Sequence, residues 1–136
     1  MKAPLYNEVH ILATAIANAS AAEDFDAAEE LYNVLWDLCL DNENKPSNHP
    51  LQWEALGDFS SETDKAIDAY QKGLAAAKAI ALPEYEASLL FAMAELNAEE
   101  SQLEVARKLI QQALTIEHRN AKLAKKIVKF AKQLGG

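Results

Sequence analysis

The side chains that most often carry chemistry are scattered along this chain. The three histidines, His10, His49 and His118, lie far apart, and no pair has the spacing of two metal ligands on one helix. Cys39 is the single cysteine, so neither an intramolecular disulfide nor a cysteine-based zinc site can form. It lies between two leucines, which favours a buried and unreactive thiol. We therefore expect no metal site.

Motifs for nucleotide or acyl chemistry are also missing from the sequence. It contains no glycine-rich phosphate loop, and two of its four glycines are the last two residues given. The serines lie outside any nucleophile-elbow pattern. Carboxylate pairs such as Glu29-Glu30 and Glu99-Glu100 are typical of solvated helix faces, since general acid–base catalysis needs a pocket. We expect no enzymatic activity, no cofactor and no small-molecule substrate.

The composition is that of a helical protein with an apolar core. Half of the 136 residues are apolar, glycine and proline number only four each, and runs of β-branched residues are missing. Residues 1–8 contain no uninterrupted apolar segment, and no stretch approaches the length needed to cross a bilayer. We expect a single cytoplasmic, all-α domain over residues 1–136.

A spacing of large and small residues in the middle of the chain is its most informative pattern, and its members are Trp53, Leu56, Gly57, Ala66 and Tyr70. This spacing resembles the tetratricopeptide repeat, in which W-x2-L-G-x2-Y on one helix is followed by A-x3-F on the next. The small residues mark places where one helix approaches another closely. Ser60 stands where the family has tyrosine, and we expect Phe59 to replace that ring.

The same pattern returns more weakly on both sides, with Ala28, Ala66 and Ala106 in equivalent positions 38 and 40 residues apart. Counted from the position of Gly57 in the motif, this alanine follows after twelve residues in the outer repeats but after only nine in the middle one. The shorter interval predicts a shortened first helix in the middle repeat. The resemblance implies a solenoid of helical hairpins. Its three degenerate repeats would span about 4–41, 49–81 and 83–117, followed by a C-terminal capping helix at 120–134.

Local signals place the ends of about seven helices. Pro83 suits a first helical turn, Asn120 can cap the last helix, and Ser101-Gln102-Leu103-Glu104 has the pattern of a capping box. Residues 41–50 form a polar, turn-rich loop. The expected helices span 4–20, 25–41, 49–59, 61–81, 83–98, 102–117 and 120–134.

The helix expected at 25–41 is apolar around almost its whole circumference. More than one packing neighbour is needed to cover such a surface, so we expect helices on both sides of it. The alternative is that Trp36 or Tyr32 belongs to a homodimer or partner surface, where a large rigid ring anchors binding.

Charge is distributed unevenly along the sequence. Residues 1–118 contain 21 acidic and 7 basic residues, a net charge of −14, whereas residues 119–136 contain six basic residues and no acidic one. In the last helix, apolar residues follow helical spacing, and the opposite side carries Lys122, Lys125, Lys126, Lys129 and Lys132. We favour a capping helix, with salt bridges to the acidic part as a further role, over nucleic-acid or anionic-membrane association.

The resemblance also implies where a partner would bind. In this family the first helices of successive repeats line a concave groove, which residues beside the Trp and Gly positions face. Carried over by position, the partner-binding residues are Leu51, Glu54, Asp58, Ser88, Phe91, Glu95, Glu99 and, less directly, His10.

This acidic set with one aromatic ring would attract a basic segment that has an apolar anchor. The sequence thus predicts a non-catalytic adaptor that binds a protein or peptide. A narrower alternative is an acidic chaperone or immunity protein that neutralises a basic secreted effector or toxin.

Overall fold

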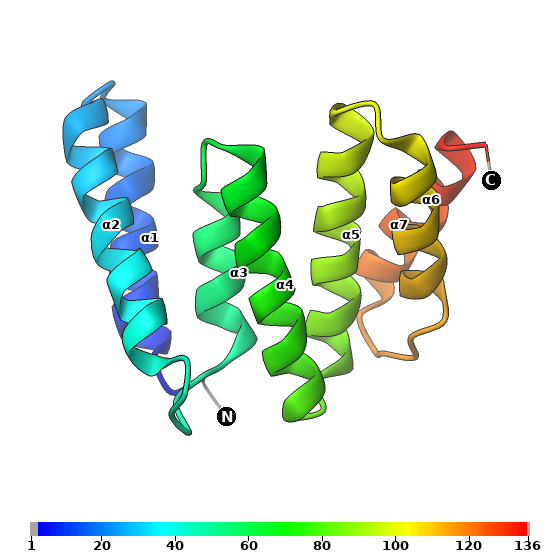
Figure 1. Cartoon of the computed structure of the whole chain (residues 1–136), viewed down its shortest axis with the longest axis horizontal. Helices are drawn as coiled ribbons and strands as arrows, with labels where there is room; N and C mark the ends of the chain where they lie inside the picture. The colour runs from blue at the N-terminus through cyan, green and yellow to red at the C-terminus, as the bar shows by residue number, and fades with distance from the viewer. Residues whose placement is uncertain (1–2, 136) are drawn as a thin grey trace. The chain divides into compact units, whose positions relative to one another are not determined.

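The computed structural model describes residues 3–135, and within that range it contains seven α-helices and no β-strand (Figure 1). The all-α prediction is confirmed, and the expected helix bounds are right to within a few residues. None of the helices in this range is long and apolar enough to cross a membrane. The helices are α1 (Tyr6–Ala21), α2 (Phe25–Asn42), α3 (Pro50–Asp58), α4 (Thr63–Ala79), α5 (Pro83–Glu99), α6 (Leu103–Leu114) and α7 (Ala121–Gln133).

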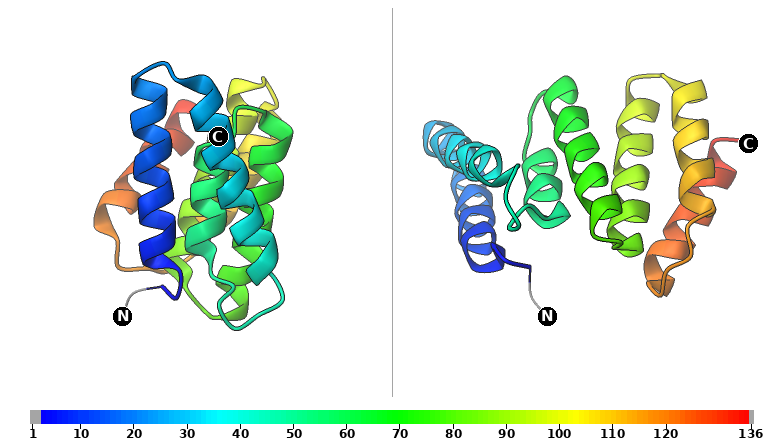
Figure 2. Two further views of the ribbon diagram at one scale, coloured as in Figure 1. Left: turned by 90° about the vertical axis from the view of Figure 1, so that its left-hand side faces the viewer. Right: turned by 60° about the horizontal axis from the view of Figure 1, so that its bottom comes forward.

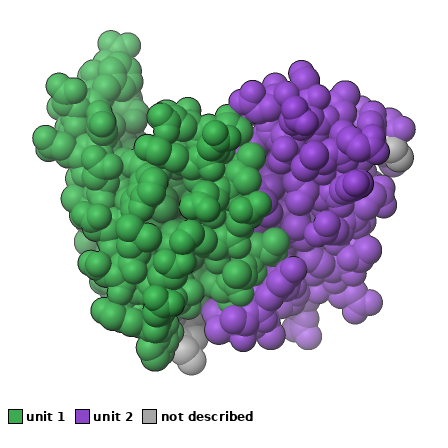
Figure 3. Space-filling view, viewed as in Figure 1, with its two compact units in different colours: residues 1–76 green, residues 77–136 purple. Residues whose placement is uncertain are grey.

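Two compact units make up the chain, residues 1–76 and 77–136 (Figure 3). The first contains α1, α2, α3 and most of α4, and the second contains the last turn of α4 with α5, α6 and α7. Their charges differ in sign. The first unit has 14 acidic and 4 basic residues, a net charge of −10, and the second has 7 acidic and 9 basic residues, a net charge of +2.

Apolar side chains from all four of its helices form the core of the first unit. The hairpin of α1 and α2 packs against α3 (Figure 2). Trp53 is only 1 % exposed, and its indole Nε1 donates a hydrogen bond to Asn48 Oδ1 (2.7 Å). Burial raises the pKa of Cys39 to about 12, so its thiol stays protonated, as the sequence predicts. The buried core comprises Val9, Ile16, Leu35, Cys39, Trp53, Leu56, Ala69 and Ala76.

The helix in the middle of the first unit is short, as the sequence spacing predicts. Helix α3 has nine residues, against 16 in α1 and 17 in α5. Directly after it, Phe59 packs against the core, and Ser60 Oγ donates to the carbonyl of Leu56 (2.8 Å). Because that bond uses the serine proton, the Tyr32 hydroxyl is the donor in its 2.6 Å bond to Ser60 Oγ. The turn after α3 is therefore attached to both the core and α2.

The second unit is a hairpin of α5 and α6 with α7 packed against α6 (Figure 2). The apolar positions of α7 point inward, since Ile127 and Ala131 are buried. Arg107 Nε of α6 donates to the carbonyl of Leu134 (3.1 Å). The helix starts where the sequence predicts, because the Asn120 side chain accepts a hydrogen bond from the Leu123 N–H (3.1 Å).

Three helices end on a non-glycine residue with left-handed backbone geometry, namely Glu23, Ala81 and Ser101, with φ of 59°, 55° and 62°. After each of them, the next N–H bonds to the carbonyl five residues earlier, at 2.7 to 2.9 Å, which is the Schellman arrangement of a helix C-terminus. The capping-box prediction at Ser101 is therefore wrong. Ser101 terminates α5, and α6 begins after Gln102, whose side chain makes no capping bond.

Glycine at these three positions should stabilise the chain. Left-handed geometry costs an L-residue about 1–2 kcal/mol, and glycine removes this cost. Glycine also loses more conformational entropy on folding, which offsets part of the gain. We therefore expect the free energy of unfolding to rise by about 0.5–1 kcal/mol per site. Urea unfolding of Glu23→Gly, Ala81→Gly and Ser101→Gly measures it. The control is Ala22→Gly, where φ is −83° and glycine should destabilise. Urea unfolding midpoints that are unchanged or lowered in all three glycine variants would contradict the left-handed geometry of these residues.

The ring of Tyr70, on α4, lies directly against Gly57 near the end of α3. A Cβ atom added to Gly57 would lie 2.7 Å from Tyr70 Cδ1 and 2.8 Å from Cζ, closer than side chains tolerate. The ring has little freedom to move, because Tyr70 is 5 % exposed and its hydroxyl donates to Asp58 Oδ1 (2.6 Å). The close helix approach predicted at Gly57 is therefore made by the tyrosine of the same motif.

Larger residues at Gly57 should destabilise the first unit through this contact. We expect Gly57→Leu to cost about 1–3 kcal/mol by overpacking, and Gly57→Ala to cost less. In a Tyr70→Leu background the ring is gone, so the cost of Gly57→Ala should fall and the two effects should not add. Thermal and urea unfolding of wild type, the two single variants and the double variant measure this coupling. Ala75→Leu, at an exposed position of α4, is the control. Additive effects would show that the ring does not restrict position 57.

Candidate functional site

The predicted partner-binding residues are divided between the two units. On α3 they follow intervals of three and four residues, and on α5 intervals of three, four and four, so each set lies on one face of its own helix. No single unit contains the whole set, and a groove built from both sets remains a prediction. The first unit carries His10, Leu51, Glu54 and Asp58, and the second carries Ser88, Phe91, Glu95 and Glu99.

Two of the four predicted residues in the first unit have structural roles. Leu51 packs against the core, and Asp58 accepts the hydrogen bond of Tyr70. His10 is exposed on α1, where its ring stacks on that of Tyr6 with centroids 5.8 Å apart. A role in binding at Leu51 or Asp58 would therefore add to a role in folding, and reversing the charge of Asp58 would also disturb Tyr70.

In the second unit, Glu95 and Glu99 are exposed, whereas Ser88 and Phe91 are half-buried. The sequence predicts Phe91 as an aromatic anchor for the partner. Its ring makes an edge-to-face contact with Phe130 of α7, with centroids 5.6 Å apart and planes at 80°. Part of the Phe91 surface therefore holds α7 in place, and only the remainder is accessible to a partner.

The carboxyl group of Asp58 is less hydrated than the residue as a whole. The residue is exposed at the end of α3, but its carboxylate accepts the hydrogen bond of the buried Tyr70. Desolvation raises the pKa of Asp58 above its usual 3.8, and the hydrogen bond from Tyr70 opposes that shift. The folded chain therefore binds the Asp58 proton more tightly than an unfolded chain does.

This shift predicts a pH effect of defined sign. Because the pKa of this carboxyl group is raised on folding, its protonated form stabilises the folded chain at pH values below its pKa in the unfolded chain. That stabilisation is lost as pH rises through its pKa in the folded chain. The side chain of Asp58→Asn keeps an oxygen that can accept from Tyr70 but cannot ionise. Its free energy of unfolding, minus that of wild type, should therefore increase from about pH 3 to about pH 7. Urea unfolding across this range measures the difference, with Asp41→Asn as the matched control. A difference that is constant or falls with pH would contradict the expectation.

A hollow of about 430 Å³ lies in the first unit between α1, α2 and the turn that precedes α4. We call it the aromatic hollow, defined by Phe25, Tyr32 and Phe59. Phe25, at the first position of α2, is 66 % exposed, whereas the other two rings are half-buried. Sequence reasoning missed this site. The available signal was a phenylalanine at the helix start, seven residues before Tyr32 and therefore on the same side of the helix.

Charged groups at the rim of the aromatic hollow are Glu29, Glu62 and Lys65. Lys65 Nζ lies 3.2 Å from a Glu62 carboxylate oxygen and 5.2 Å from the ring centroid of Trp36. Glu29 is exposed and makes no ion pair with the residues described for this unit. The rim is thus acidic overall.

The two aromatic residues considered for a homodimer surface pack within the first unit. Tyr32 and Trp36 lie edge to face, with ring centroids 5.8 Å apart, and both contact the core. Both are half-buried. Helices α1 and α3 both pack against α2, but they do not cover its whole circumference as expected, because Val34 and Leu40 remain 52 % and 46 % exposed. Tyr32 also lines the aromatic hollow.

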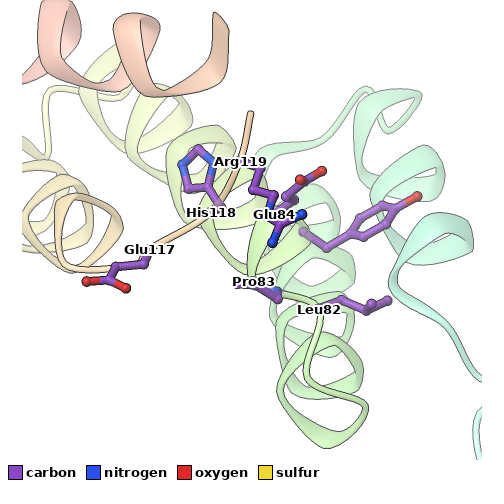
Figure 4. Close-up of a pocket in the computed structure, with 7 residues that line it drawn as sticks. Leu82, Pro83, Glu84, Glu117, His118 and Arg119 are labelled. Carbon is purple, nitrogen blue, oxygen red and sulfur yellow. The ribbon is translucent and has the colours of Figure 1, made fainter. Parts of the chain in front are cut away.

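A cavity of about 530 Å³ in the second unit lies between the start of α5 and the segment before α7 (Figure 4). Leu82 and Pro83 line it, with Glu84 and Arg119 drawn next to one another and Glu117 directed away from them. The Nδ1 atom of His118 accepts the backbone N–H of Asn120 (3.1 Å). Because acidic and basic groups mix here, the cavity has no preference for a charged ligand of one sign.

The basic side of α7 is exposed. Lys122, Lys125, Lys126, Lys129 and Lys132 are all exposed, and none forms an ion pair with a carboxylate described in the second unit. The salt bridges considered as a further role for this helix are therefore not formed within its own unit. Val128 lies among these lysines and is 42 % exposed.

No family model matches the chain, and no curated protein matches it either. Over residues 3–135, no three histidine, cysteine, aspartate or glutamate side chains gather in a way that could hold a metal ion.

Proposed function

We propose that the chain is a non-catalytic binding protein whose first unit holds a basic protein or peptide segment by an apolar anchor. The exposed ring of Phe25 at the aromatic hollow is the observation that carries this proposal. A large exposed aromatic side chain beside two further rings offers the apolar contact area on which binding hot spots depend.

Size and charge favour a basic segment with one large apolar side chain. The hollow of about 430 Å³ is near the small end of ligand sites, which span about 300–1,000 Å³, so it suits a single anchoring side chain. The first unit has a net charge of −10, and Glu29 and Glu62 lie at the rim. Such a field would speed the encounter with a basic partner.

We further propose that the fold is a tetratricopeptide-like solenoid that serves as an adaptor. The contact of Tyr70 with Gly57, the helical hairpins and the buried alanines Ala66 and Ala106 support it. The exposed carboxylates Glu95 and Glu99 then form a second candidate contact surface. A dedicated chaperone or immunity protein would use the same contact with one partner only.

Selection of displayed random peptides on the immobilised full chain tests the proposal without a known partner. The enriched peptides should combine lysine or arginine with one large apolar residue, and their binding should weaken with salt. No enrichment, or enrichment of acidic peptides, would contradict the proposal.

Phe25→Ala should weaken the binding of a selected peptide roughly tenfold or more, mainly through faster dissociation, since hot-spot truncations cost about 2 kcal/mol or more. The stability of the chain should stay within about 0.5 kcal/mol, because the ring is exposed. Surface plasmon resonance and urea unfolding measure the two effects.

The matched control is Ile11→Ala, which removes another exposed apolar side chain, 67 % exposed, on α1. A second variant, Glu95→Lys with Glu99→Lys, distinguishes the α5 surface from the hollow. Unchanged binding in Phe25→Ala, with loss in the α5 variant, would move the site to α5 and reject the aromatic hollow.

A further inference from the structure

Two helix faces in this chain carry opposite charges around an exposed valine. On α2, Glu30 and Asp37 flank Val34, which is 52 % exposed. On α7, Lys125 and Lys132 flank Val128, which is 42 % exposed. Ala124, Val128 and three lysines line a shallow depression on α7.

The spacings of the two faces match when the helices run antiparallel. From Glu30 to Val34 is four residues and from Val34 to Asp37 is three, and the same intervals separate Lys132, Val128 and Lys125 when α7 is read backwards. At 1.5 Å per residue, the outer charges of each face lie about 10 Å apart along the helix. Antiparallel docking therefore places valine against valine and each carboxylate opposite an ammonium group.

The charges on both faces lack partners within their own units. None of these two carboxylates and two lysines forms an ion pair with a residue described in the same unit. By contrast, Lys72 of the first unit lies 2.8 Å from Glu43. Val34 and Val128 likewise leave apolar surface in water.

We propose that the chain self-associates head to tail, with the α2 face of one copy docked on the α7 face of the next. This goes beyond the proposed function and does not involve the aromatic hollow. The contact is heterologous, so a pair of copies still has one free α2 face and one free α7 face, and assemblies grow with concentration unless a ring closes.

A second copy fits the lysine face of α7 better than a membrane or a nucleic acid does. Ile127 and Ala131, the inner side of α7, are buried in the second unit and cannot enter a bilayer. The aromatic residue of α7, Phe130, packs edge to face on Phe91, so its ring does not stand among the lysines for base stacking. The chain itself supplies the complementary charge, since its first unit has a net charge of −10.

Sedimentation velocity of the full chain over a concentration series tests the proposal. At about 0.01 M salt, where the Debye length is about 30 Å, the mean mass should rise with concentration, and at about 1 M salt it should return to that of the monomer. Lys125→Glu with Lys132→Glu should weaken association more than tenfold, and so should Glu30→Lys with Asp37→Lys. An equimolar mixture of the two variants should associate again, because each supplies a face that complements the other.

The matched control is Lys45→Glu with Lys108→Glu, which makes the same charge change at exposed lysines elsewhere and should associate like wild type. A chain that is monomeric at every concentration in low salt would overturn the proposal. So would association that the α7 variant leaves intact, that the control abolishes equally, or that the mixture fails to restore. A monomer that instead binds vesicles of anionic phospholipid, or RNA, through the α7 lysines would also reject it.

Discussion

The first unit depends on one contact, the ring of Tyr70 packed on the bare backbone of Gly57 with its hydroxyl bonded to Asp58. The missing side chain lets α4 approach the end of α3, and the hydrogen bond fixes the ring. The turn between these helices is thereby held in place. It carries Phe59 into the core and Ser60 to Tyr32 of α2, and it contributes to one wall of the aromatic hollow.

Much of the fold follows from local patterns in the sequence. Helical periodicity and composition predict seven helices, and the nine-residue interval before Ala66 predicts the short α3. The prediction of a capping box at Ser101 is wrong because this residue belongs to the end of α5 and cannot also cap α6. The backbone bonds that close α5 involve Ser101 and Gln102, and this leaves no serine cap for α6. A local motif cannot show which of two adjacent helices will use it.

The candidate site was less predictable, because it depends on contacts between residues far apart in the chain. Phe25 and Phe59 line one hollow although they are far apart in sequence, and the bond between Tyr32 and Ser60 connects α2 to the turn after α3. Position within a repeat predicts Phe91 as an anchor, but it does not reveal that Phe130 covers part of that ring. Charge counts, in contrast, predict the acidic first part and the basic last helix directly.

In the proposed binding mode, the aromatic hollow of the first unit holds the apolar anchor of a basic segment. A crystal structure of the full chain with a selected peptide would show this contact. We expect one large apolar side chain of the peptide in contact with Phe25, Tyr32 and Phe59, with basic residues near Glu29 and Glu62. A peptide bound along Glu95 and Glu99 of α5, with the hollow empty, would contradict it.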